Sequence, residues 1–136
     1  MSRNLDLARQ LYEVWNREGV GMFESLRDRI APEVESVEPP EFPGAGAHTG
    51  VEEWRAAMER QLEGWDRIVF EPQEFFESGD RVMVEARVVT RGRSTQLETE
   101  FTIFHVITVL NGRVTRFMSF FRRDLAHAEL ARNVSS

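Results

Sequence analysis

The first half of the chain opens with apolar side chains at the spacing of helices. Across residues 3–18 they recur every three or four positions, which places them on one face of a helix. These positions are Leu5, Leu7, Ala8, Leu11, Tyr12, Val14 and Trp15. The pattern stops at Gly19 and Gly21, resumes at Met22 and ends before Pro32, because proline disfavours helix at the residue before it. We therefore expect two successive helices.

A short strand, a loop and a third helix are expected next. The letters EVESVE, residues 33–38, alternate as in a strand. Residues 39–50, PPEFPGAGAHTG, are rich in proline and glycine and predict a loop that could form a rim or lid. Thr49 and Glu52 match the T-x-x-E capping pattern, so we expect a helix over residues 51–62.

From Ile68 onward the apolar period changes to two, which is typical of strands. Turn signals interrupt it at SGD, RGRS and NG, residues 78–80, 91–94 and 111–112. This half of the chain therefore predicts a run of antiparallel strands.

The order of the elements indicates a single α+β domain spanning residues 1–136. Its curved antiparallel sheet is expected to wrap around the three N-terminal helices. Residues 124–136 are expected to end the domain as a short helix or tail.

The segment LETEFTIFHVITVL, residues 97–110, separates into two faces when written out by alternation. One face is mainly apolar and is the better core face; its members are Leu97, Thr99, Phe101, Ile103, His105, Ile107 and Val109. The other face is acidic at its start and apolar at its end, where Phe104 and Val106 lie. Because the outer face is partly apolar, we expect a second copy of the chain to cover it, giving a homodimer.

Composition removes several classes of function. The chain has 136 residues, 41% of them hydrophobic, a net charge of −6 and no cysteine. An acidic chain without a basic, aromatic stripe is not expected to bind nucleic acid. Without cysteine there are no disulfides, thiolate metal sites or cysteine nucleophiles. No apolar run has the length of a membrane span, and the N-terminus is charged where a signal peptide would be apolar, so we expect a cytoplasmic protein that enters no membrane.

Glu38 is the first candidate for chemistry. It lies four residues beyond Val34 and two beyond Ser36, so a strand that buries Val34 also turns this carboxylate inward. Two interpretations stay open: a general base in an apolar pocket, or an exposed loop acid beside Pro39.

His105 also has two interpretations. It is either a core histidine with a local hydrogen bond or a pocket residue that shares a proton with Glu38. His48 is either a lid contact or solvated, and we favour the solvated state. No ligand spacing among His48, His105 and His127 indicates a metal site.

Five segments in order resemble the SnoaL-like group of the nuclear transport factor two-like superfamily, which includes steroid delta-isomerase, polyketide cyclases and limonene epoxide hydrolase. They are ARQLYEVWNREG, APEVESVEPPEF, HTGVEEWRAAMERQLEGW, FFESGDRVMVEARVV and FHVITVLNGRVTRFMSFF. The resemblance implies a cone of curved sheet closed by helices, with a mainly apolar pocket at its wide end. Members include enzymes and non-enzymes, so the fold alone does not decide function.

The resemblance to steroid delta-isomerase implies roles for three residues. Tyr12 lies seven residues before Gly19 and matches the donor tyrosine of that enzyme. Glu38 directly precedes a proline and falls at the place of its catalytic Asp. His105 stands at the place of its second donor, which is also an Asp. Two of the three residue types are changed. The Asp-Arg-Asp arrangement of epoxide hydrolysis is not matched, because Ser119, Ile103 and His105 occupy the candidate places.

The same resemblance implies an apolar pocket. Its expected lining residues are Trp15, Phe101, Ile103, Phe117, Ser119 and Phe121. We expect the ligand to be a small hydrophobic carbonyl compound. The expected reaction is isomerisation or aldol-type cyclisation by acid–base chemistry, with Glu38, His105 and Tyr12 as catalytic residues. We expect no metal or cofactor. The alternative is a non-catalytic module of the same fold that binds a hydrophobic ligand or serves dimerisation.

Overall fold

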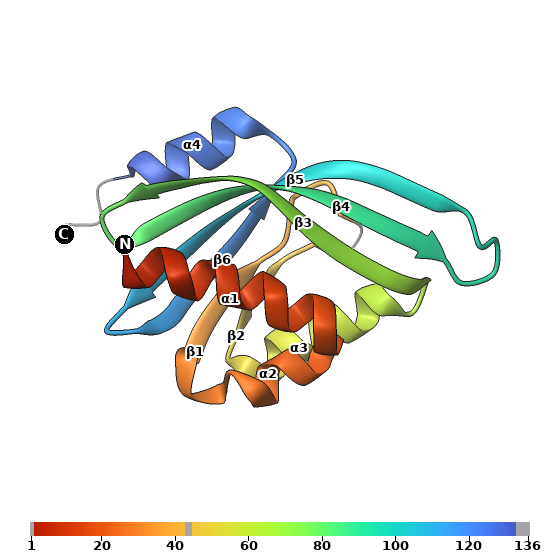
Figure 1. Ribbon diagram of the computed structural model, residues 1–136, viewed down its shortest axis with the longest axis horizontal. Helices are drawn as coiled ribbons and strands as arrows, with labels where there is room; N and C mark the ends of the chain where they lie inside the picture. Colours follow the sequence, from red (N-terminus) through yellow and green to blue (C-terminus); the bar gives the residue numbers. More distant parts are fainter. Residues whose placement is uncertain (1, 43–44, 133–136) are drawn as a thin grey trace.

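The structure, a computed structural model, describes residues 2–42 and 45–132 and combines helices with one six-stranded sheet (Figure 1). The helices are α1 (Arg3–Glu18), α2 (Met22–Ser25), α3 (Val51–Leu62) and α4 (Arg123–Ala131), with 3-10 turns at Gly19–Gly21 and Arg27–Arg29. The strands are β1 (Ile30–Val37), β2 (Ala47–Thr49), β3 (Trp65–Ser78), β4 (Arg81–Gly92), β5 (Glu98–Leu110) and β6 (Arg113–Phe120). The predicted α+β class is therefore confirmed.

The strand order is β2-β1-β6-β5-β4-β3, and every neighbouring pair is antiparallel except β1 and β6. The sheet is thus mixed, whereas the sequence predicted an antiparallel one. A parallel neighbour requires a long connection, and here the whole of β2, α3, β3, β4 and β5 lies between β1 and β6. Alternation within one strand contains no information about the direction of its neighbour.

Most of the predicted element boundaries are observed. Helix α1 begins at Ser2, whose hydroxyl accepts hydrogen bonds from Asn4 N at 3.1 Å and Leu5 N at 3.2 Å. It ends at Gly19, which has a φ of 60°. Asn111 and Gly112 both have positive φ, as the two-residue turn between β5 and β6 requires.

Two predicted elements differ from the structure. The second helix is only one turn long and is flanked by 3-10 turns. The segment predicted as a loop contains β2, because residues 47–49 pair with the free edge of β1.

The start of α3 corrects the expected capping pair. The N-cap is Gly50, with a φ of 95°. Glu53, not Glu52, reaches back and accepts a hydrogen bond from Thr49 N at 2.8 Å. Glu53 lies three residues beyond the N-cap, the position from which a glutamate returns to the start of a helix.

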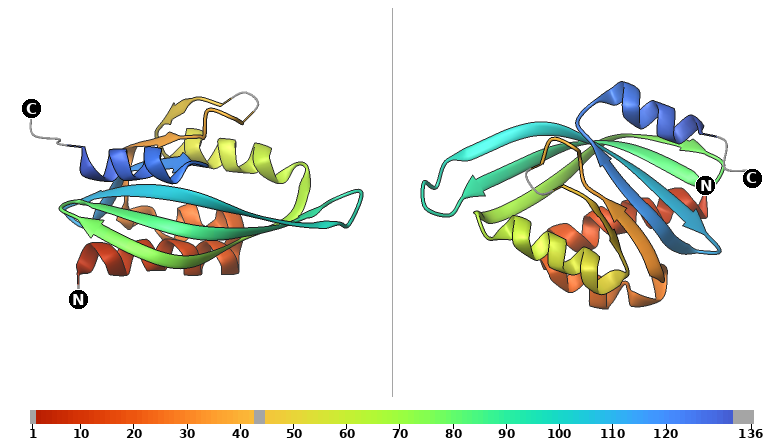
Figure 2. Two further views of the ribbon diagram at one scale, coloured as in Figure 1. Left: turned by 90° about the horizontal axis from the view of Figure 1, so that it is seen from above. Right: turned by 180° about the vertical axis from the view of Figure 1, so that it is seen from behind.

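Register shifts bend the sheet. They occur twice between β3 and β4, once between β5 and β6 and once between β1 and β6. A bulge inserts an extra residue into one strand and increases the local bend and twist. The bent sheet partly encloses α1, and α4 lies on the opposite face (Figures 1 and 2).

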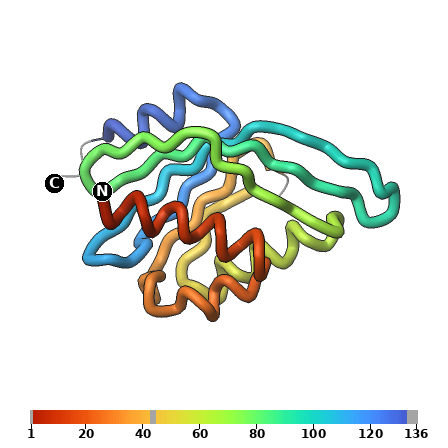
Figure 3. Tube along the Cα trace, in the orientation of Figure 1, coloured from red at the N-terminus to blue at the C-terminus, as the bar shows by residue number. Residues whose placement is uncertain are grey.

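The main core lies between the concave face of the sheet and the N-terminal helices. Inward residues of β4 and β5, such as Val84 and Ile107, are fully buried there against Leu11 and Phe23. The backbone trace shows α1 running along β3 on this side (Figure 3). The predicted inner face of β5 is therefore confirmed as a core face.

A second apolar cluster lies on the outer face and revises the reasoning behind the homodimer. Phe104 and Val106 pack with Met83 and with Ala126 of α4, so the helix of the same chain covers them. Their apolar character therefore needs no second copy. The homodimer through the outer face stays a prediction, which sedimentation equilibrium tests by reporting the mass of one or two chains.

None of the helices in residues 2–42 and 45–132 has the length and apolar composition needed to cross a bilayer. Of the predicted C-terminal segment, α4 is observed, and residues 133–136 lie outside the described residues.

Truncating a core side chain tests the placement of the main core. Ile107 is 0% exposed, and Ile107→Ala is expected to lower the free energy of unfolding by about 2–5 kcal/mol, because it removes buried apolar contacts and leaves a cavity. Leu97 is 69% exposed, and Leu97→Ala is expected to change that free energy by less than about 0.5 kcal/mol. Urea unfolding of both variants measures the difference; equal losses would contradict this core.

Candidate functional site

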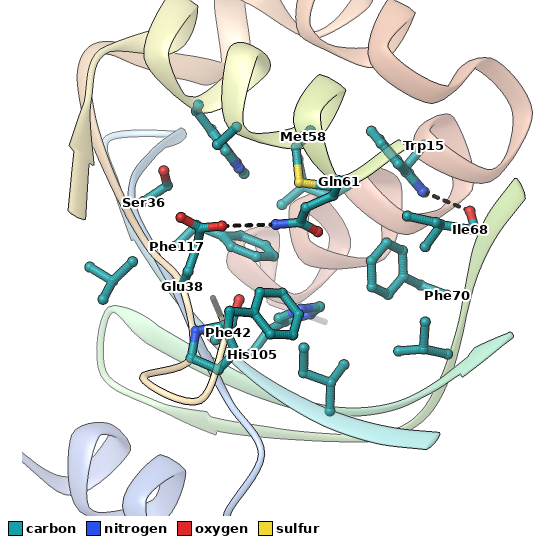
Figure 4. A pocket seen from close by; sticks show the side chains of 18 of the residues that line it. Trp15, Ser36, Glu38, Phe42, Met58, Gln61, Ile68, Phe70, His105 and Phe117 are labelled. Carbon is teal, nitrogen blue, oxygen red and sulfur yellow. Dashed lines mark hydrogen bonds between the residues drawn. The ribbon is translucent and has the colours of Figure 1, made fainter. Parts of the chain in front are cut away.

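A cavity of about 810 Å³ lies between the concave face of the sheet and the helices (Figure 4). All nine side chains that the sequence predicted as catalytic or as lining a pocket line it. They are Tyr12, Trp15, Glu38, Phe101, Ile103, His105, Phe117, Ser119 and Phe121. The wall is mainly apolar, and aromatic rings from several elements contribute to it. The structure therefore brings the candidate residues together at one site.

Hydrogen bonds between α1 and β3 set the position of α1 over the cavity. Trp15 Nε1 donates to the carbonyl oxygen of Ile68 at 3.1 Å. Asn16 makes two bonds to the backbone of Phe70, donating to its carbonyl oxygen at 2.7 Å and accepting from its N–H at 3.0 Å. Because Tyr12 lies one turn before Asn16, these bonds also fix the direction of its side chain.

Tyr12 and His105 form a buried pair on one wall of the cavity. The Tyr12 hydroxyl lies 2.7 Å from His105 Nδ1, and the two side chains are 4% and 3% exposed. The ring of His105 also lies 4.5 Å from the ring of Phe117 and 5.4 Å from that of Phe70, measured between centroids. Within the described part of the chain, the His105 side chain has no hydrogen bond besides the one to Tyr12. Its Nε2 therefore has no hydrogen-bond partner among the described residues.

Glu38 lies at another wall and has its own partners. His48 Nε2 is 2.7 Å from Glu38 Oε1, and Gln61 Nε2 donates to Glu38 Oε2 at 3.1 Å. The Glu38 and His48 side chains are 15% and 17% exposed. The bond to Gln61 crosses from the end of β1 to α3 (Figure 4). Of the two interpretations from the sequence, the exposed loop acid is wrong, and the carboxylate faces the cavity.

Glu38 and His105 do not share a proton directly. Glu38 directly follows β1 and His105 lies in β5, and β6 lies between these strands in the sheet, so about two strand spacings, about 10 Å, separate them. On β6, Ser119 pairs with His105. The expected Glu38–His105 contact is therefore replaced by two separate pairs on the wall of one cavity, with room for a ligand between them.

The placement of His48 corrects the expectation of a solvated side chain. β2 pairs with β1 so that His48 lies opposite Ser36, beside the carboxylate of Glu38. The sequence signal was weak, because three strand residues stand inside a segment dominated by proline and glycine.

Gln61 was missed by the sequence analysis although a signal existed. It lies seven residues after Trp54 and four after Ala57, on the stripe of α3 that faces the interior. A polar residue at that position is aimed at the cavity.

The arrangement provides an acceptor and a potential donor in an apolar enclosure. Glu38 is a carboxylate that can accept a proton, and the Tyr12–His105 pair offers a group that can hydrogen-bond an oxygen. The Ser36 side chain adds a buried hydroxyl with no partner in the described residues. Residues 2–42 and 45–132 contain no cluster of three His, Asp or Glu side chains placed to hold a metal ion.

Comparisons with known proteins identify relatives of this fold. A crystal structure of an NTF2-like protein of unknown function from Burkholderia pseudomallei K96243 is 24% identical, with a TM-score of 0.77 over 98% of this chain and 100% of the other. TerC, co-crystallised with polyporic acid, is 22% identical, with a TM-score of 0.76 over 95% and 98%. IdmH from Streptomyces antibioticus, to which polyketide cyclase activity is attributed, is 20% identical, with a TM-score of 0.71 over 87% and 91%.

No match was found among curated proteins. The sequence does match the profile of the SnoaL-like domain over residues 8–117, which is most of the chain and runs from within α1 to Phe117 in β6. The curved sheet, the helices and the cavity agree with that match, and the chain belongs to the SnoaL-like domain family.

Proposed function

We propose that the protein binds a small apolar carbonyl compound in the cavity and moves a proton on it by acid–base catalysis without a cofactor. The observation behind the proposal is that Glu38, directly after β1, and the Tyr12–His105 pair, from α1 and β5, line the same apolar cavity. The co-crystallisation of TerC with polyporic acid supports a small-molecule ligand for this fold. The activity attributed to IdmH supports a cyclase type of chemistry.

Burial keeps Tyr12 and His105 uncharged at neutral pH. It lowers the pKa of His105 to about 3 and raises the pKa of Tyr12 well above its ordinary value, since an apolar environment disfavours the charged form of each group. With the imidazole proton on Nε2, the Tyr12 phenol donates to Nδ1. His105 Nε2 then carries a hydrogen that can be donated to a ligand oxygen.

The proposed reaction begins when a Glu38 oxygen takes a proton from the carbon beside the carbonyl group. The electron pair of the broken C–H bond moves into the carbonyl group, whose oxygen becomes an enolate oxyanion. His105 Nε2–H donates a hydrogen bond to this oxyanion, and the bond from Tyr12 holds the ring in place. A neutral, fixed donor is suited to this role because it needs no reorganisation as the charge develops.

Glu38 returns its proton at the end of the reaction. In an isomerisation, the proton goes to a different carbon of the enolate. In an aldol-type cyclisation, the enolate carbon attacks a second carbonyl group and Glu38 protonates the resulting alkoxide. Both routes balance with the atoms of the substrate and one shuttled proton, so neither needs an oxidant or a reductant.

Binding without turnover is the second candidate function. The Tyr12 hydroxyl is hydrogen-bonded to His105, and each oxygen of Glu38 has a donor within the protein, as expected of a cavity whose polar groups only bind and orient a ligand. A purely structural dimerisation module is less well supported, because such a module predicts an interior filled by side chains rather than a cavity of about 810 Å³.

Replacing the proposed base separates catalysis from binding. Glu38→Gln is expected to lower kcat by about 10²–10⁴-fold, because an amide cannot accept the substrate proton. Turnover is measured with 5-nitrobenzisoxazole, which opens when it loses one C–H proton, and with a β,γ-unsaturated cyclohexenone. Binding of 2-naphthol, followed by tryptophan fluorescence, is expected to change less than about threefold, since Trp15, Trp54 and Trp65 line the cavity and the apolar wall is intact.

The matched control is Glu41→Gln, which removes an exposed carboxylate from the neighbouring loop and is expected to keep wild-type turnover. Unchanged turnover in Glu38→Gln would rule out the assigned base. A wild-type protein that binds the naphthol but turns over neither probe would favour the binding function.

The pH dependence of stability tests the neutral state of His105. Its pKa is about 3 in the folded protein against 6.5 as the ordinary value, so below pH 6.5 the unfolded chain binds a proton that the folded chain does not. The contribution of His105 to the free energy of unfolding is therefore fully present above pH 6.5 and decreases as the pH falls toward 3. The expected slope is up to about 1.4 kcal/mol per pH unit.

The measurement is urea unfolding between pH 6.5 and about pH 5, where most carboxyl groups are still ionised. His105→Gln is expected to remove this part of the slope, whatever its effect on stability at pH 7. His127→Gln replaces an exposed histidine of α4 and is expected to retain the slope. If His105→Gln and wild type have the same slope, His105 is not held neutral by burial.

A further inference from the structure

Glu38 is held by two side chains that the proposed reaction does not use. His48 Nε2 lies 2.7 Å from one carboxylate oxygen, and Gln61 Nε2 donates to the other at 3.1 Å. We infer that His48 and Gln61 are positioning residues that fix the Glu38 carboxylate for proton removal. This inference rests on the proposed function, because it assigns how the base of that reaction is oriented.

The direction of both hydrogen bonds follows from the chemistry of the groups. An ionised carboxylate only accepts, so a hydrogen on His48 Nε2 and one on the Gln61 amide nitrogen must be donated to it. A neutral His48 is therefore protonated on Nε2, and its Nδ1 is unprotonated. Each carboxylate oxygen has a further lone pair, so the two bonds leave acceptor capacity for a substrate proton.

The three side chains are ordered from the cavity outward. Glu38 and Gln61 line the cavity, whereas His48 is absent from its wall although it contacts Glu38. His48 thus lies behind the carboxylate and acts on a ligand only through Glu38. This arrangement distinguishes it from His105, which lines the cavity directly.

Two rigid elements support the donors. β2 is held against β1 in register, with Ser36 opposite His48, and Glu38 N donates to the carbonyl oxygen of Gly46 at 3.1 Å. Gln61 comes from the last turn of α3, whose start is tied to β1 by the bond from Gly50 N to the Val34 carbonyl oxygen at 2.7 Å. A flexible glutamate held from two elements keeps one orientation, and a fixed base transfers protons faster than one that samples several rotamers.

The first experiment measures the bond without any turnover. A long-range ¹H–¹⁵N spectrum of wild type reports which ring nitrogen of His48 carries hydrogen. The expected result is a neutral form protonated on Nε2 alone in wild type and a mixture of both tautomers in Glu38→Leu, where no carboxylate accepts the Nε2 hydrogen. A neutral His48 protonated on Nδ1 would overturn the inference.

The second experiment measures kcat and KM for 5-nitrobenzisoxazole. His48→Leu and Gln61→Met remove one donor each while keeping bulk, and each is expected to lower kcat by about 10 to 100-fold with KM changed less than about threefold. His48→Gln places an amide N–H donor in the same region and is expected to recover part of the lost kcat. His127→Leu, a histidine change on α4, is the control and is expected to keep wild-type values.

The outcomes separate this inference from the proposed function. Wild-type kcat in both His48→Leu and Gln61→Met, with activity lost in Glu38→Gln, overturns the positioning role and leaves the base assignment intact. A rise in KM alone also overturns it, because it indicates a binding role. If turnover is absent or does not depend on Glu38, the proposed function fails, and the His48 tautomer alone then decides whether the carboxylate is held as described.

Discussion

The curvature of the six-stranded sheet is the constraint on which the site depends. Register shifts in β3–β4, β5–β6 and β1–β6 bend the strands, so the sheet has a concave face against which the N-terminal helices pack. Side chains from α1 and α3 cover this face without filling it, which leaves the cavity of about 810 Å³. The curvature of the sheet therefore contributes to the space between the sheet and the helices in which a ligand could bind.

Burial of polar groups in this cavity explains how they are paired. A buried polar atom without a partner is costly, so Tyr12 bonds His105, and Glu38 bonds both His48 and Gln61. The two sets differ in charge: burial keeps Tyr12 and His105 neutral, whereas Glu38 has two donors suited to a carboxylate. An acceptor and a neutral donor at separate places on the wall of one cavity are the parts that enolate chemistry needs.

Local patterns predicted much of the fold because helix and strand periods depend on neighbours in sequence. The inward face of β5, with His105 at its middle, follows from alternation alone. The helix from Val51 to Leu62 was predicted from a capping pattern at its start, although the residues that form the cap differ. The parallel pairing of β1 with β6, the strand at residues 47–49 and the cover of Phe104 by α4 were not predicted. Each of these depends on contacts between segments far apart in the chain.

The sequence by itself determined the type of most elements, because helix and strand periods depend on residues close together in the chain. Through the family resemblance it also indicated nine of the residues that line the cavity. Only the tertiary structure decided which of them touch. Placing β6 between β1 and β5 separates Glu38 from His105 by two strand spacings, and pairing β2 with β1 brings His48 to Glu38 instead. Strand order and the pairing of a short edge strand are set by the packing of the whole sheet, which no local pattern of residues specifies.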